Sequence, residues 1–217
     1  MKLRAAIFDL NGTLVDDIAY HYRAWKALGD RHGFAMDEAI FQSINGFKNE
    51  DIFPRLMGGE VEPARMQALA EEKEDMYREL YRPHLAPLAG AEALLDRLRA
   101  AGVKLAVASS APIRNRELVI EGLDWHDRFD LVVANENLRG KPAPDIFLAA
   151  AERLAVPPGE CLVFEDAVNG VNAAKAAGIT CVGVTTNVSA AELREAGAVL
   201  TIPDFEGLPE DLDGLLA

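Results

Sequence analysis

The stretch AAIFDLNGTLVDD at residues 5–17 joins a short apolar run directly to a segment rich in acids and turn residues. The run that ends before Asp9 is too short and too evenly apolar for a half-exposed antiparallel strand, so it predicts a strand that is buried on both faces. Burial of such a strand requires no aspartate at its end. Asp9 is therefore a candidate for chemistry, and the presence of Asn11 two residues later needs its own explanation.

Similar apolar runs recur along the chain at 103–110, 129–134, 161–166 and 179–186, with a shorter one at 198–202. Helical patterns lie between them at 91–101, 145–154 and 168–177. Strand–helix–strand repeats of this length are typical of a parallel sheet. The predicted fold class is therefore α/β, with a Rossmann-like parallel sheet core and helices on both faces.

The interval 15–82 breaks this rhythm, because it contains several helical stretches and no strand-like run. It predicts an all-helical cap domain inserted after the first strand. The segment 81–90, which has two prolines and a glycine, is expected to be the return hinge. The predicted domains are a core made of 1–14 and 83–217, and a helical cap made of 15–82.

Composition excludes several classes of function. The net charge of −13 over 217 residues argues against nucleic acid as a partner. No apolar run approaches the roughly 20 residues that span a membrane, and no signal-like region precedes Asp9. Cys161 and Cys181 lie in apolar runs, which favours two buried thiols while leaving a disulfide open. A cytoplasmic protein is expected, with a monomer as the default.

Polar residues stand where the predicted strands end. In open parallel sheets, ligands bind at the carboxyl ends of the strands. Those ends carry Asp9, Ser109, Glu165 and Asp166, and Lys141 follows the third strand by seven residues.

Three carboxylates gathered at one edge repel one another unless a cation neutralises them, and Mg²⁺ prefers oxygen ligands. Together with a hydroxyl and an ammonium group, they predict a phosphate site in which Ser109 and Lys141 bind the phosphoryl oxygens. The alternative is that strand-end acids only cap the next helix, as Asp166 could do for a helix starting at Val168.

Four short motifs follow one another in the order of a known family. They are DLNGT at 9–13, VASS at 107–110, GKPAPDIF at 140–147 and FEDAVNG at 164–170. In these motifs the chain resembles the haloacid dehalogenase (HAD) superfamily, and the helical insertion is similar to that family's small cap domain. Within the superfamily it most resembles β-phosphoglucomutase and the related sugar phosphatases.

The resemblance implies roles for individual residues. Asp9 would be the nucleophile that forms an aspartyl-phosphate. Mg²⁺ would be bound by Asp9, the backbone carbonyl of Asn11 and Asp166, with Glu165 close by or bound through water. The substrate would be a small phosphorylated metabolite. The resemblance places these further residues near it: Gly12, Thr13, His21, Lys48, Asn49, Lys73, Ser110, Ala111 and Arg114.

Two of these cap residues have ordinary alternatives, since His21 could be a surface histidine and Lys73 a salt-bridge partner of a nearby acid. The cap segment INGFKNEDI at 44–52 also departs from the mutase pattern. Asn45 and Asn49 stand where the mutase has a lysine and an arginine that hold the distal phosphate, although Lys48 could replace one of them. This favours a phosphatase over a mutase, while a dehalogenase would not need Glu165 and Asp166.

Asn11 occupies the position at which the family has an aspartate that acts as general acid and base. A carboxamide has no titratable proton near neutral pH, and such a group contributes about 10²–10⁴ in rate. Reduced or conditional activity is therefore expected. Asn11 could be engineered, natural, or converted to aspartate by deamidation of the Asn11–Gly12 pair. A non-catalytic metabolite-binding module is a further alternative, which the retained Asp9 disfavours.

Overall fold

The computed structural model describes residues 3–44, 49–135 and 137–209. The chain divides into two compact units, a core of Met1–Asp16 with Ala86–Ala217 and a second unit of Asp17–Leu85. The sequence predicted domain boundaries after residues 14 and 82. In the structure the chain passes from one unit to the other after Asp16 and after Leu85. Each unit has a hydrophobic core of its own.

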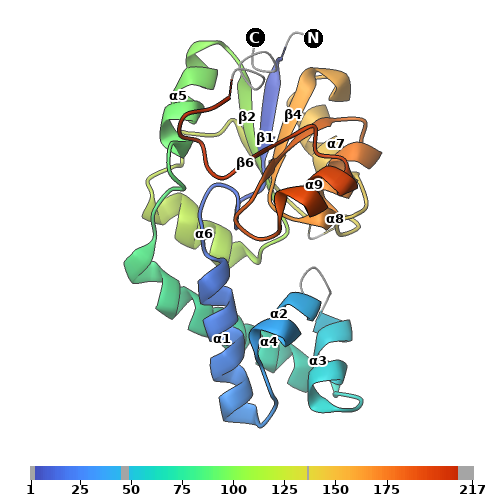
Figure 1. Cartoon of the computed structure of the whole chain (residues 1–217). Helices are drawn as coiled ribbons and strands as arrows, with labels where there is room; N and C mark the ends of the chain where they lie inside the picture. Colours follow the sequence, from blue (N-terminus) through green and yellow to red (C-terminus); the bar gives the residue numbers. More distant parts are fainter. Residues whose placement is uncertain (1–2, 45–48, 136, 210–217) are drawn as a thin grey trace. The chain divides into compact units, whose positions relative to one another are not determined.

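The core contains a parallel sheet with the strand order β3-β2-β1-β4-β5-β6 (Figure 1). The strands are β1 (Ala5–Phe8), β2 (Lys104–Ser109), β3 (Leu131–Ala134), β4 (Cys161–Glu165), β5 (Thr180–Val184) and β6 (Leu200–Ile202). Each of them lies within an apolar run identified in the sequence, and the short run at 198–202 supplies β6. In the pairing register Phe8 lies opposite both Val107 and Phe164, so β1, β2 and β4 end side by side.

Helices cover both faces of this sheet, as predicted. Side chains alternate between the faces along a strand. Ala5 and Ile7 share one apolar cluster with residues of three helices, α7 (Asp145–Arg153), α8 (Val168–Ala176) and α9 (Ala190–Ala196). Phe8 points to the other face, where its ring stacks on Phe164 with centroids 4.8 Å apart. Against β2 lies α5 (Ala91–Ala100), which with α6 (Ile113–Gly122) appears on the opposite side of the sheet from α7 (Figure 1).

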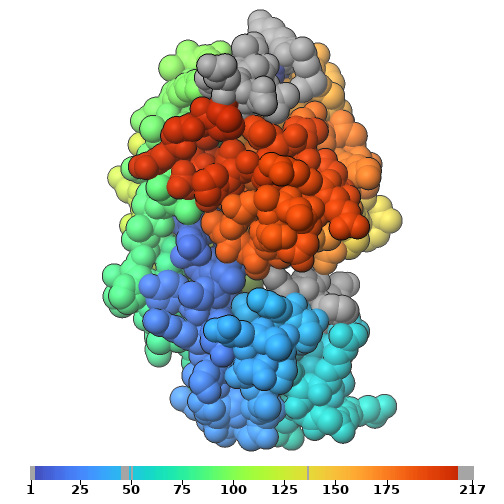
Figure 2. Space-filling model, viewed as in Figure 1, coloured from blue at the N-terminus to red at the C-terminus, as the bar shows by residue number. Residues whose placement is uncertain are grey.

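The segment from α9 to residue 209 covers one side of the core (Figure 1). The space-filling view shows this segment, drawn in red, as a continuous part of the core's surface (Figure 2). It is fixed at Gly90, where φ is +74° and an added Cβ would lie 2.4 Å from the carbonyl carbon of Phe205. The Phe205 N–H also donates to the Ala89 carbonyl at 2.9 Å. Gly90, within the expected hinge segment, is thus required by a close backbone approach.

The second unit is helical, with its own buried centre. Its elements are α1 (Ile18–His32), α2 (Glu38–Ile44), α3 (Asn49–Met57), α4 (Pro63–Tyr81) and the 3₁₀ turn η1 (Arg82–His84); a second 3₁₀ turn, η2 (Pro158–Glu160), precedes β4 in the core. The centre contains Trp25, Leu28, Phe34, Met36, Ile44, Ile52, Phe53 and Leu69. All four of these helices contribute to this apolar group, which makes the insertion a folded unit rather than a long loop.

The structure bears on two features predicted from the sequence, the absence of a membrane span and the state of the two cysteines. Within the described ranges, none of the helices is both long and apolar enough to cross a bilayer. Cys161 and Cys181 are free thiols, and both are buried. The interpretation as core thiols is therefore confirmed over the disulfide.

Candidate active site at the carboxyl edge of the sheet

Three carboxylates meet where β1 and β4 end. Asp9 follows β1, Glu165 ends β4, and Asp166 comes next in the chain. Because the two strands are adjacent and parallel, these side chains leave the sheet at the same edge. One oxygen atom from each lies within 4.8 Å of the others, and all three residues are buried.

Lys141 is the cation that holds this cluster together. Its Nζ donates to Asp9 Oδ1 and to Glu165 Oε2, each at 2.6 Å. Nζ also lies 5.0 Å from the centroid of the Phe147 ring. The loop that carries Lys141 is fixed by Arg139, whose guanidinium donates to both carboxylate oxygens of Asp145 at 2.6 and 3.0 Å. A single ammonium group thus bridges two strand ends from a loop.

Burial and neighbouring charges shift the pKa values of Glu165, Asp166 and Lys141. Burial, together with the Asp9 charge, raises the pKa of Glu165 to about 7, although Lys141 opposes the rise. Burial and the Glu165 and Asp9 charges raise the pKa of Asp166 well above its ordinary value. Burial alone would lower the pKa of Lys141, but the Asp9 and Glu165 carboxylates outweigh it and raise the pKa. One ammonium group therefore does not fully neutralise three buried carboxylates.

The three carboxylates fit a hard divalent cation. They supply oxygen ligands from two strand ends, which is the chemistry that Mg²⁺ selects. The raised pKa values of Glu165 and Asp166 indicate that further positive charge would stabilise the ionised cluster. Asp9, Glu165 and Asp166 are thus the residues that could hold such an ion.

Two glycines make room for the acidic pair. A Cβ at Gly12 would lie 2.2 Å from Asp166 Oδ2, and one at Gly170 would lie 2.0 Å from the carboxyl carbon of Glu165. Gly12 also has a positive φ of +78°, which side-chain-bearing residues rarely adopt. Each acid is thus seated against a glycine. Sequence reasoning included Gly12 but missed Gly170, whose only signal was its position in FEDAVNG.

The turn at 11–15 is tied down by polar contacts. The Gly12 N–H donates to the Val15 carbonyl at 2.8 Å, and Thr13 Oγ1 donates to Asp166 Oδ1 at 3.2 Å. The Thr186 hydroxyl donates to the Gly12 carbonyl. Thr186 follows β5, so it is one more strand-end residue, and sequence reasoning missed it. The signal was its place in the run 179–186.

Ser109 is the buried hydroxyl at the end of β2. It is 1% exposed, and its Oγ accepts the Ala111 N–H at 3.1 Å. Arg116 fixes the same loop by donating to the Ala111 carbonyl at 2.5 Å. Ser110 and Arg114 are exposed. The structure thus places Ser109 at the same edge as the acids, while Arg116 is a loop contact that sequence reasoning did not identify.

Helix capping does not explain the acidic pair. The N-cap of α8 is Ala167, which has no side-chain cap hydrogen bond. Asp166 precedes the cap position and accepts from Thr13 instead. The alternative in which Asp166 only caps α8 is therefore wrong.

Three of the predicted cap residues lie in the second unit, and Lys48 lies outside the described residues, as does Asn45. His21 on α1 and Lys73 on α4 are in contact, with His21 Nδ1 2.9 Å from Lys73 Nζ. Lys73 also pairs with Glu74 at 2.8 Å and is buried, although the sequence around it looks like a solvated acidic run. Asn49 begins α3 and is exposed.

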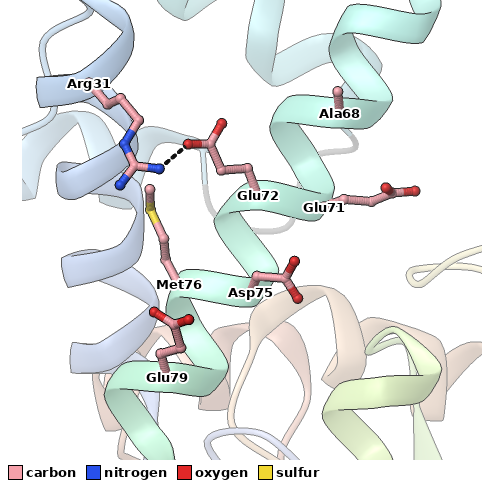
Figure 3. Close-up of a pocket in the computed structure, with 7 residues that line it drawn as sticks. All are labelled: Arg31, Ala68, Glu71, Glu72, Asp75, Met76 and Glu79. Carbon is pink, nitrogen blue, oxygen red and sulfur yellow. Dashed lines mark hydrogen bonds and ion pairs between the residues drawn. The ribbon is translucent and has the colours of Figure 1, made fainter.

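A hollow of about 490 Å³ lies on α4 of the second unit (Figure 3). Its walls contain four acids, with Arg31 as the cation among the lining residues; the full lining is Arg31, Ala68, Glu71, Glu72, Asp75, Met76 and Glu79. Arg31 is already engaged, because its Nη1 donates to Glu72 Oε1 at 2.5 Å. A surface of this charge repels a phosphate anion, so the hollow is a poor candidate for a phosphate site.

Comparison with known proteins agrees with this geometry. A family model described as haloacid dehalogenase-like hydrolase matches residues 3–178, which include the strand-end acids, Ser109 and Lys141. The chain belongs to this family. A β-phosphoglucomutase from Bacillus subtilis is 35% identical over 191 residues, covering 84% of this chain and 83% of that protein.

Two further members of the family show the same likeness. A phosphorylated carbohydrates phosphatase from Thermotoga maritima is 32% identical, covering 94% of this chain and 96% of its own length. The crystal structure of a HAD hydrolase of family IA, variant 3, from Entamoeba histolytica superposes with a TM-score of 0.91 at 30% identity, covering 99% of each chain. These HAD relatives are named as sugar phosphomutases and phosphatases, so the chain is an enzyme of that broad class.

Proposed function

We propose that this chain is a Mg²⁺-dependent phosphatase of a small phosphorylated metabolite, most simply a sugar phosphate, and that it works through an aspartyl-phosphate on Asp9. The observation that carries the proposal is the contact of Lys141 with both Asp9 and Glu165 beside Asp166. This arrangement places a nucleophile, an anion-binding cation and a metal-ligand set at one strand edge. We place the enzyme in the cytoplasm as a monomer, where its two free buried thiols suit a reducing compartment.

In the first step, a carboxylate oxygen of Asp9 attacks phosphorus, and the bond between phosphorus and the sugar oxygen breaks. Lys141 and Ser109 bind the phosphoryl oxygens, on which negative charge develops. Bound Mg²⁺, held by Asp9, Asp166 and Glu165, would supply further charge stabilisation. In the second step, water attacks phosphorus, the bond to Asp9 breaks, and inorganic phosphate leaves.

Both steps need a proton transfer that Asn11 does not supply. The leaving sugar oxygen must gain a proton, and the attacking water must lose one. A carboxamide does neither near neutral pH, so solvent has to serve, and the rate falls by about 10²–10⁴. Activity is therefore low as long as residue 11 remains an asparagine.

Deamidation would restore the missing acid. In that reaction the Gly12 nitrogen attacks the Asn11 side-chain carbonyl carbon, ammonia leaves, and water opens the succinimide to aspartate or isoaspartate. The Gly12 N–H, however, donates to the Val15 carbonyl at 2.8 Å, and the Thr186 hydroxyl holds the Gly12 carbonyl. These contacts oppose the attack in the folded chain, so deamidation of Asn11 is expected to be slower in folded than in denatured protein, which peptide mass spectrometry can measure.

A sugar phosphomutase is the second candidate, and the 35% identical β-phosphoglucomutase favours it. A mutase must hold a doubly phosphorylated intermediate while that intermediate reorients in the active site. Asn49, in the cap segment that departs from the mutase pattern, is exposed and carries no charge. A phosphatase needs to hold only one phosphate, so hydrolysis remains the first proposal.

A panel of phosphorylated sugars with Mg²⁺ tests the proposal, with and without a hexose bisphosphate activator. Release of inorganic phosphate supports the phosphatase, and activator-dependent isomerisation without phosphate release supports the mutase. If the protein binds a sugar phosphate but catalyses neither reaction, even after Asn11→Asp, the result would support a non-catalytic binding module. Asp9→Asn is the matched control, because it removes the nucleophile at similar size.

A further inference from the structure

A buried line of polar contacts runs through the helical unit. Asp17, just before α1, is fully buried and accepts the hydroxyl of Tyr77 from α4. His21 Nε2 lies 3.6 Å from the same Asp17 carboxylate oxygen. On the other side of the imidazole ring, Nδ1 lies 2.9 Å from Lys73 Nζ. The order of groups is therefore carboxylate, imidazole and ammonium.

The ring of His21 is fixed by stacking. Its centroid lies 3.8 Å from that of Tyr77, and the two planes differ by 2°. Tyr77 thus contributes twice, because its ring fixes the plane of the imidazole and its hydroxyl holds the carboxylate. Burial, reinforced by the Asp17 charge, raises the pKa of Tyr77, so the phenol keeps the proton that it donates.

The hydrogen-bond roles determine where the ring proton lies. A lysine ammonium group has three donors and no acceptor, so Nδ1 of His21 must accept. The ring proton of the neutral imidazole is then on Nε2, where it faces the Asp17 carboxylate. The reverse tautomer would place an N–H against the ammonium and a lone pair against the carboxylate.

We propose that Asp17 is a positioning residue, which fixes the orientation and tautomer of His21 and, through His21, the place of the Lys73 ammonium. The inference rests on the proposed function, because His21 and Lys73 are the residues of the helical unit proposed to meet the substrate. Lys73 gains further support from Glu74 at 2.8 Å and from the Trp25 ring at 5.5 Å. A preorganised ammonium binds an anionic substrate without first losing side-chain freedom.

Nuclear magnetic resonance tests the tautomer directly and needs no substrate. The chain has four histidines, so ¹⁵N labelling of histidine gives few signals, and His21→Gln identifies those of His21. The expected result is a proton on Nε2 and an accepting Nδ1. A proton on Nδ1 in the unmodified chain would overturn the proposal.

Asp17→Asn should speed exchange of the Nε2 proton with solvent by about tenfold, because the facing charge is gone. Asp30→Asn is the matched control, since Asp30 lies on α1 together with His21 and its side chain is 72% exposed. It should leave the His21 signals unchanged. Tyr77→Phe keeps the ring stack and removes only the hydroxyl, so it should act in the same direction if Asp17→Asn does not fold. Unchanged exchange in both variants contradicts the positioning role.

Kinetics separate positioning from a merely structural role. With whichever hexose phosphate of the panel is hydrolysed, Asp17→Asn should raise KM about tenfold and change kcat by less than about twofold. In a Lys73→Met background the same change should have no further effect, because the group being positioned is absent. An equal rise in KM in both backgrounds would overturn the proposal. If no hexose phosphate is hydrolysed, the proposed function fails, while the resonance test of Asp17 still stands.

Discussion

Replacing Lys141 with methionine should destabilise the core unit in a pH-dependent way. Methionine keeps most of the side-chain length and removes the charge. Each 2.6 Å contact with Asp9 or Glu165 is worth about 6 kcal/mol gross at an effective dielectric constant of about 20. Desolvation of the three groups offsets much of this attraction. Removing one member of a buried ion pair costs about 3–5 kcal/mol net, which is the expected loss in unfolding free energy at pH 8 without metal.

The unfolding free energy lost by Lys141→Met should be smaller at acidic pH. The folded-state pKa of Glu165 is about 7, raised from 4.5 by burial with a contribution from the Asp9 charge, and loss of the Lys141 cation would raise it further. A carboxyl with a raised pKa stabilises the fold below its unfolded pKa, and this contribution disappears as the pH rises through the folded value. At pH 5 the carboxyls take up protons in place of the missing cation, so the loss should be less than about half of that at pH 8.

Denaturant unfolding with a chelator present measures both values. The chain has two tryptophans, and Trp25→Phe leaves the buried Trp125 as a reporter of the core unit. Arg4→Met is the matched control, because Arg4 lies in the same core unit and its exposed side chain pairs with Glu160 at 2.9 Å; the loss in unfolding free energy should be about 0–1 kcal/mol at either pH. A loss for Lys141→Met that is equal at pH 5 and pH 8 would refute the electrostatic reasoning and indicate that the aliphatic stem matters instead.

Three further predictions concern the same unit. Gly170→Ala, whose Cβ would meet the Glu165 carboxyl carbon at 2.0 Å, should weaken Mg²⁺ binding in calorimetry at least about tenfold, whereas Gly159→Ala, which has open space, should not. Metal-free protein should lose on the order of 3 kcal/mol between pH 5 and pH 8, because the Glu165 pKa is raised, and Mg²⁺ should restore stability mainly at pH 8; equal Mg²⁺ stabilisation at both values would contradict this. Cys161, whose pKa burial raises to about 11, and Cys181 should resist a thiol reagent at pH 8 until the protein is denatured.

The sheet edge was predictable because a parallel sheet brings the carboxyl ends of its strands together. Apolar runs located β1, β2 and β4, so the positions of Asp9, Ser109 and the acidic pair followed from topology. Lys141 was a weaker inference, since it lies in a loop whose path the sequence does not specify. Its double contact with Asp9 and Glu165 appears only in the structure.

Other site residues could not be found from sequence, because their roles depend on contacts between distant segments. Gly170 matters through the space that Glu165 occupies, and Thr186 through the Gly12 carbonyl 174 positions away. Asp17 follows Asp16 in a run that looks like a solvated turn. Its burial depends on Tyr77, which lies 60 positions further along the chain.

The most direct test of the account is the rate of phosphate release by Asn11→Asp. The account predicts that this change raises kcat by about 10²–10⁴ over the unmodified chain with Mg²⁺ and a hydrolysed sugar phosphate, and that Asp9→Asn in the same background abolishes the gain. Peptide mass spectrometry of the unmodified sample ensures that deamidated Asn11 does not contribute to its rate. An unchanged kcat would contradict the assignment of residue 11 as the missing acid and base.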